Sequence, residues 1–293
     1  MSTATADLEA IATRRQAVRG LAFTGPAVLY TLAFFATPLA VILIASLYAS
    51  DAGRLGGDPG FGNYARFFAR DSLLVALTNS VRLAAITTVV SLALAYPLAY
   101  VLAFRVPARW QRLGIVLAVL PFWTSYVVRS YAWLLVLAPE GVVNGTLMAL
   151  GLIDTPLRIA YSDAATVIGF VHFFVMLLTL TIFSSLVQIN PRYLLAAADM
   201  GAGPWTAFFR VLLPLSLPGV VSGAFMTFVL AIGDYVTPAI LGGSKSLVLP
   251  QAMFFQISRN GDFAMASAMA VVLMAVMAIA YLAAARWLRM DRV

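Results

Sequence analysis

The chain has 293 residues, of which 62% are hydrophobic and 11% are charged. Ordinary soluble domains are about 45–50% apolar and about 25% charged, so a water-soluble fold could not bury this much apolar surface. The formal net charge is +7, and the sequence contains no cysteine and a single histidine, His172. These counts exclude a disulfide framework, a thiolate metal site and a histidine-cluster metal site, so we expect no metal and no cofactor.

Six apolar stretches appear when the sequence is divided at charges and turn-forming clusters. Each reaches the roughly 20 residues needed to cross about 30 Å of hydrocarbon. The first stretch far exceeds the apolar core of a signal peptide, which spans about 7–15 residues, so we interpret it as a retained anchor. The fold class predicted is therefore all-α, a polytopic membrane bundle of six transmembrane helices. The predicted spans are 21–48, 73–104, 113–138, 164–189, 211–241 and 263–285.

The distribution of arginine predicts the orientation of this bundle. Six spans put both termini on one side, and that side holds eleven of the 19 basic residues but four of the 12 acidic ones. Basic residues mark the cytoplasmic face of a membrane protein. Both termini are therefore predicted to be cytoplasmic, with residues 1–20 forming an N-terminal tail. Because this topology signal accounts for the basic balance, we expect the lipid bilayer as a partner and no nucleic acid.

The cytoplasmic segment 190–214, between the fourth and fifth spans, carries the most specific pattern. Asn190 followed by proline is an N-cap and first-turn pair, and two glycines from Gly201 onward are a stop signal, so a short helix over 191–200 is predicted. A second short amphipathic helix is predicted to begin at Pro204 and to end before the proline ten residues later. Two short helices at an angle would form a knob that fits a groove on another protein.

The spacing in this loop resembles the EAA loop of ABC-importer permeases. The family pattern is Glu-Ala-Ala, three residues, Gly, nine residues, Ile, one residue and Leu-Pro. Leu195 occupies the position of the family glutamate, which removes one polar contact that the family pattern implies. In that family the loop is the coupling helix that docks on the ATPase. The resemblance thus implies a coupling role for Leu195, Ala196, Ala197, Asp199, Gly201, Val211, Leu213 and Pro214.

A wider resemblance covers roughly residues 60–290, which we expect to form the permease core. Segments 121–133, 141–145 and 233–243 are similar to the spermidine/putrescine permease branch. The resemblance implies a type I ABC importer permease in the bacterial inner membrane that moves a small, cationic, polyamine-type solute. It also implies an ABC ATPase dimer, a second permease subunit and a periplasmic solute-binding protein. Another small organic solute, moved by the same mechanism, is the alternative.

Charged side chains well inside the predicted spans are costly and mark functional sites by default. Arg129 and Asp234 lie at similar predicted depths near the periplasmic side. We expect them to pair or to line a water-filled cavity; a purely structural ion pair and a snorkelling arginine are the alternatives. A carboxylate with aromatic neighbours suits a polyammonium chain. The candidate solute pathway comprises Tyr126, Arg129, Tyr131, Asp234, Tyr235 and Thr237.

Other residues and functions are weaker candidates. His172 is predicted to hydrogen-bond between helices rather than to relay protons, and Arg82 is predicted at the outer boundary of the second span. An ion-gradient-driven secondary transporter would need intramembrane cation-coordinating groups, for which Asp234 is the one clear acidic candidate. A membrane-embedded enzyme would need clustered acids, histidines or an activated nucleophile, which the spans lack. No G-x-x-x-x-G-K-[ST] loop occurs, so we expect no enzymatic activity here and ATP hydrolysis on a partner.

Overall fold

The computed structural model describes residues 20, 23–51, 54–243 and 247–288. The predicted bundle of six membrane-spanning helices is confirmed, since six segments of this described part are long and apolar enough to cross a membrane. The predicted tail, apart from Gly20, lies outside the described residues. The six segments are Phe23–Ala45, Asp71–Phe104, Tyr126–Ala149, Asp163–Val187, Pro204–Gly233 and Phe263–Ala285.

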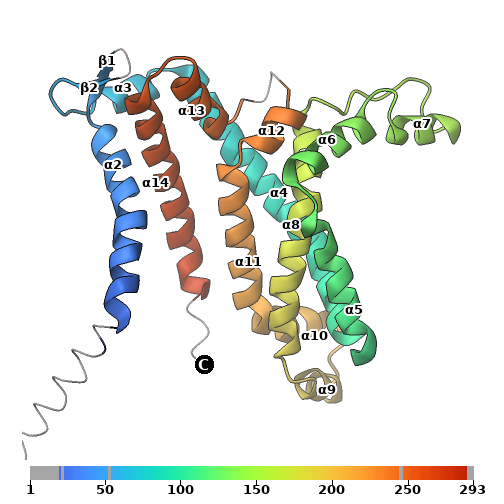
Figure 1. Ribbon diagram of the computed structural model, residues 1–293. Helices are drawn as coiled ribbons and strands as arrows, with labels where there is room; N and C mark the ends of the chain where they lie inside the picture. The colour runs from blue at the N-terminus through green and yellow to red at the C-terminus, as the bar shows by residue number, and fades with distance from the viewer. Residues whose placement is uncertain (1–19, 21–22, 52–53, 244–246, 289–293) are drawn as a thin grey trace, which may run out of the picture.

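Three long helices form the centre of the bundle (Figure 1). These are α4 (Asp71–Phe104), α8 (Asp163–Val187) and α11 (Leu213–Gly233), which pack against one another in all three pairings. Glycines let α8 and α11 approach closely, because a Cβ atom at Gly223 would collide with the Thr181 hydroxyl of α8. At 1.5 Å per residue, α4 is about 51 Å long, which exceeds the thickness of the hydrocarbon core.

The first and last crossings stand side by side at one flank of this centre (Figure 1). The first includes a π-helical turn, η1 (Leu32–Ala36), and α2 (Thr37–Ala45), and the last is α14 (Phe263–Leu288). Large apolar side chains on both helices are exposed, among them Ile44 and Ile279. Such exposure would be unfavourable in water, and it fits contact with lipid.

A cap of short elements covers one end of the bundle (Figure 1). It contains a small antiparallel hairpin of β1 (Ala49–Asp51) and β2 (Arg54–Gly56), in which Ser50 pairs with Leu55. The helices α3 (Gly62–Phe68) and α13 (Leu249–Ser258) lie beside this hairpin. The opposite end carries α9 (Arg192–Asp199) and α10 (Pro204–Ala207).

The third membrane-length segment, Tyr126–Ala149, begins later than the predicted span 113–138. The predicted span is not one continuous helix. It consists of α5 (Ala108–Val119), a 3-10 turn η2 (Leu120–Trp123) and α6 (Tyr126–Leu137). Ser125 is extended, with ψ of 132°, and separates η2 from α6. The prediction was wrong at this point because Pro121 has no N–H to donate to the preceding turn.

A proline also ends α6. Ala138 precedes Pro139 and is extended, with ψ of 157°, as expected for a residue whose helical conformation clashes with the following proline ring. The chain resumes as α7 (Val142–Ala149). In Figure 1, α6 lies against α8 near the capped end of the bundle, and α7 extends away from it.

The fifth crossing also departs from the prediction at both ends. The second short helix of the loop does not end before Pro214, because α10, a π-helical turn η3 (Phe208–Leu212) and α11 run on as one helical segment, Pro204–Gly233. Leu213 donates its N–H to Phe208, five residues earlier, and this local rewinding accommodates a proline that cannot donate. The crossing ends at Gly233 rather than continuing to residue 241.

Candidate functional site

A side chain just before α9 binds the first backbone donor of the helix. The Asn190 side-chain oxygen accepts a hydrogen bond from the Arg192 N–H at 3.0 Å, which satisfies one of the donors that every helix start leaves free. The helix lies at the end of the bundle where the first crossing starts and the last crossing finishes (Figure 1). The structure therefore contains the short helix that the sequence predicts over 191–200, with bounds Arg192–Asp199.

The same helix ends in a glycine-dependent turn. Gly201 has φ of +81°, a conformation that strains other residues. Its N–H donates to the Ala198 carbonyl at 2.9 Å, and the N–H of Ala202 donates to the Ala197 carbonyl at 3.0 Å. These two bonds form a Schellman motif, which satisfies carbonyls that the helix end leaves without helical donors. The chain thereby reverses toward α10.

The outer surface of this loop carries large apolar side chains. Leu195, at the family glutamate position, is 64% exposed. Met200 and Trp205, further along the same loop, are exposed as well. The two alanines of the motif face different ways, since Ala196 is exposed whereas Ala197 is 3% exposed. Ala197 therefore packs inward, and Ala196 is the one of the pair that another protein could approach.

The remaining residues of the predicted coupling set divide between surface and interior. Asp199 and Gly201 are exposed, and so is Pro214 at the start of α11. Val211 and Leu213 are half-buried on either side of the fully buried Leu212. Leu212, between two residues of the pattern, thus anchors the loop to the bundle, while most of α9 is exposed.

At the other end of α11, four of the predicted pathway residues come together. The Tyr126 hydroxyl, at the start of α6, contacts both the Asp234 carboxylate and the Thr237 hydroxyl. The second Asp234 oxygen accepts from the Val236 N–H at 2.8 Å, which starts α12 (Val236–Leu241). Asp234 therefore links α6 to the break between α11 and α12.

Arg129 lies one turn further along α6 and is 6% exposed. The central carbon of its guanidinium group lies 5.1 Å from the centre of the Tyr126 ring and 4.7 Å from that of Phe173. Both distances fall within the range of cation–π attraction. Phe173, on α8, was not among the predicted pathway residues. In that stretch the sequence analysis singled out only its neighbour, His172, as a residue that would bind another helix.

The other two predicted pathway residues lie apart from this group. Tyr131 is exposed on α6. Tyr235 stacks on Phe254 of α13, with ring centres 5.5 Å apart and an interplanar angle of 11°. This stacking gives Tyr235 a packing role between the start of α12 and α13.

The two weaker candidates have structural partners. His172 accepts a hydrogen bond at Nδ1 from the Trp133 indole at 2.8 Å, so the predicted bond between helices is confirmed. Arg82 forms an ion pair with Asp163 at the start of α8. Both side chains are substantially exposed, and such pairs contribute little to stability.

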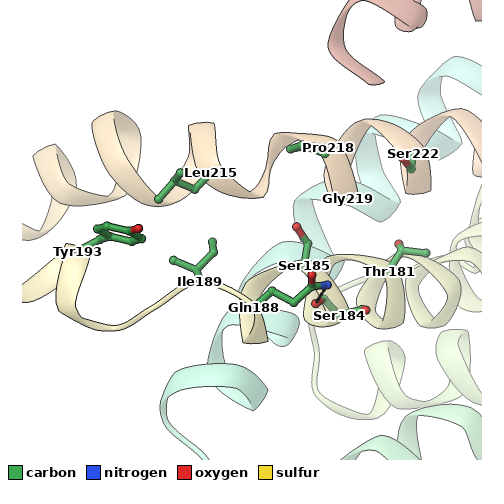
Figure 2. Close-up of a pocket in the computed structure, with 10 residues that line it drawn as sticks. All are labelled: Thr181, Ser184, Ser185, Gln188, Ile189, Tyr193, Leu215, Pro218, Gly219 and Ser222. Atoms are coloured by element: carbon green, nitrogen blue, oxygen red, sulfur yellow. Dashed lines mark hydrogen bonds between the residues drawn. The ribbon is translucent and has the colours of Figure 1, made fainter. Parts of the chain in front are cut away.

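A polar pocket of about 550 Å³ lies between α8 and α11, near α9 (Figure 2). Sequence reasoning missed it, although a signal was present: polar residues recur on α8 at the i, i+3, i+4 and i+7 spacing of one helix face. The facing residues of α11 follow the same spacing. The lining residues are Thr181, Ser184, Ser185, Gln188, Ile189, Tyr193, Leu215, Pro218, Gly219 and Ser222.

Comparisons with known proteins agree with this architecture. A family model described as binding-protein-dependent transport system inner membrane component matches residues 112–290. The spermidine/putrescine transport system permease protein PotB of Haemophilus influenzae is 31% identical over 252 residues, which cover 85% of this chain and 87% of that protein. PotB of Escherichia coli K12 is 32% identical over 203 residues, 69% of this chain and 74% of that protein.

Solved structures show the same fold. A chain in the crystal structure of a bacterial ABC transporter involved in the import of the acidic polysaccharide alginate superposes with a TM-score of 0.77 at 16% identity. The match covers 98% of this chain and 100% of that chain. The family match, the curated relatives and the six-helix architecture lead to one conclusion: the chain belongs to the binding-protein-dependent transport system inner membrane components and is a multi-pass ABC-importer permease.

Proposed function

We propose that this permease imports a small polyammonium solute of the spermidine and putrescine type. The observation that carries the proposal is the similarity to PotB over 85% of the chain. The carboxylate of Asp234, beside the ring of Tyr126, supports a cationic solute, because charge attraction and aromatic faces both favour ammonium groups.

Asp234, Tyr126 and Thr237 form part of the solute pathway in this proposal. Arg129 already lies over the Tyr126 ring. An ammonium group that reaches Asp234 therefore takes a position next to a cation that the protein itself supplies. The resulting repulsion keeps the solute from binding too tightly to be released.

The 190–214 loop couples the permease to a separate ATPase dimer. This role is supported by the exposed apolar side chains of Leu195 and Met200, since exposed apolar clusters on a water-facing loop mark interaction sites. The end that carries α9 is then cytoplasmic, together with both chain termini. ATP-driven closure of the ATPases pushes on α9 and switches the bundle between outward- and inward-facing states.

The remaining partners complete an importer. Residues 60–290 form the permease core, with the 21–48 helix at its flank, and a second permease subunit completes the pathway. A periplasmic binding protein delivers the solute to the opposite end, near Asp234. No ATP-binding loop of the G-x-x-x-x-G-K-[ST] type occurs in the sequence, so the proposal assigns ATP hydrolysis to the partner ATPase.

The test is uptake by the complete transporter in proteoliposomes with purified ATPase and binding protein. ATP-dependent accumulation of labelled spermidine or putrescine is expected. Uptake of a different solute, with no uptake of either polyamine, would overturn the assignment of solute while leaving the permease role intact. Full uptake after deletion of residues 196–203 would overturn the coupling role of the loop.

A further inference from the structure

The polar pocket near α9 is unusual for a membrane-spanning region. Hydroxyl groups inside such helices commonly donate to a carbonyl one turn back, as Thr181 does to Leu178 at 3.0 Å. Here, however, hydroxyl-bearing residues of two helices line a single hollow, Ser184 and Ser185 on α8 and Ser222 on α11 (Figure 2). Polar groups inside a membrane are costly, and their clustering indicates a wet functional surface.

The chemistry of the lining suits a cation held without a carboxylate. The pocket presents the hydroxyls together with Gln188, whose amide nitrogen donates to the Ser184 carbonyl at 2.9 Å and leaves the amide oxygen as an acceptor. Each lining residue is uncharged. Neutral oxygens bind ammonium groups weakly enough for release.

The position of the pocket connects it to both working ends of the proposed importer. Ser222 precedes Asp234 by 12 residues on α11, about 18 Å along the helix axis. On the other side, Tyr193 belongs to α9 and Ile189 lies in the link between α8 and α9. A solute in the pocket would therefore touch the crossing helices and the docking helix at once, and a shift of α9 would change the shape of the pocket.

We propose that this pocket is a low-affinity release site for the polyammonium solute, and that Tyr193 links its occupancy to the position of α9. The inference rests on the proposed function for the identity of the solute. Solute that accumulates on the α9 side would then occupy the pocket, contact the tyrosine ring by cation–π attraction and oppose the next movement of α9. Reciprocal coupling between the two events follows from linkage.

The natural absence of cysteine permits a direct test of binding. A single cysteine replaces either Ser184 or Ser222 in the assembled transporter. The transporter is placed in inside-out vesicles without binding protein. Modification of the cysteine by N-ethylmaleimide, an uncharged reagent, is then followed by mass spectrometry. Spermidine at twice its dissociation constant should slow modification about threefold, because only the empty pocket reacts. Val187→Cys is the matched control, since Val187 is an exposed α8 residue outside the lining. An uncharged diol of similar length should give no protection.

The outcomes separate the pocket from the proposed function. Spermidine uptake by the wild type, measured in parallel, with no protection of either cysteine overturns the release site. Protection without uptake supports the site and overturns the assignment of transported solute, and absence of both overturns both. Tyr193→Leu tests the link to α9: wild-type ATPase activity should fall as spermidine rises on the α9 side, and the variant should lose this response. An unchanged response in the variant overturns the link.

Discussion

The hydroxyl of Tyr126 donates a hydrogen bond to the carboxylate of Asp234, 108 residues further along the chain. The bond joins the start of α6 to the end of α11, so it fastens two crossings at the points where each is interrupted. Interrupted helices in transporters bring polar groups to the solute pathway. A cationic solute on this route would compete with Tyr126 for the carboxylate.

Replacing Asp234 with asparagine should separate charge from hydrogen bonding. The amide oxygen can still accept from Val236, but the negative charge is lost, so we expect the initial rate of spermidine uptake to fall about tenfold, which corresponds to about 1.4 kcal/mol. Asp234→Ala loses both contributions and should fall further. Asp154→Asn, at an exposed loop acid, is the control. Unchanged uptake in both Asp234 variants would remove this residue from the pathway.

The turn after α9 gives a second prediction. Gly201→Ala places a Cβ on a residue with φ of +81°, which costs about 1–2 kcal/mol. The loop should then be less well ordered, and less ATPase should co-purify with the permease. Gly203→Ala is the control, because Gly203 has φ of −66° and open space around its Cα. Equal loss of ATPase in the two variants would argue against a specific need for the Gly201 conformation.

The apolar surface of α9 gives a third prediction. Leu195→Glu restores the family residue but removes an exposed leucine, whose burial in a partner contributes about 1.5–3 kcal/mol. We expect affinity for the cognate ATPase to fall about tenfold or more, as measured by titration of the detergent-solubilised permease. Leu195→Met keeps an apolar side chain and should bind normally. Tighter binding by the glutamate variant would show that the ATPase groove is built for a polar residue.

The contact between α8 and α11 gives a prediction about stability. A Cβ atom at Gly223 would collide with the Thr181 hydroxyl and lie 3.0 Å from a Leu178 methyl group. Gly223→Ala should therefore destabilise the protein by about 1–3 kcal/mol and lower its thermal unfolding midpoint in detergent. Gly145→Ala, in α7 with open space around it, should leave the midpoint unchanged or raised. A midpoint for Gly223→Ala equal to that of Gly145→Ala would contradict the close approach of the helices.

Local chemistry explains the part of the fold that the sequence predicts well. Runs of apolar residues mark crossings because lipid demands them, and Asn190 and Gly201 mark the ends of α9 because each satisfies specific backbone groups. The interruptions at Ser125 and Asp234 were not predicted. Apolar composition continues across both of them, and hydropathy alone carries no information about backbone conformation. Pro121 was the one sequence signal of the first interruption.

Long-range pairing explains what sequence reasoning could not supply at the site. Depth estimates put Arg129 and Asp234 near one level, but the contact of Tyr126 with Asp234 depends on how α6 leans against α12. The pocket is a similar case. The spacing of Ser184 and Ser185 was readable on α8, yet nothing local indicates that this face meets Ser222.

The uninterrupted segment Pro204–Gly233 has a consequence for how the sequence can vary. Successive residues are rotated by about 100° around a helix axis. One inserted or deleted residue would therefore turn Asp234 away from Tyr126 while Trp205 stayed in place. We expect relatives to keep the number of residues in this stretch, and to keep small residues at Gly219 and Gly223, where it touches α8.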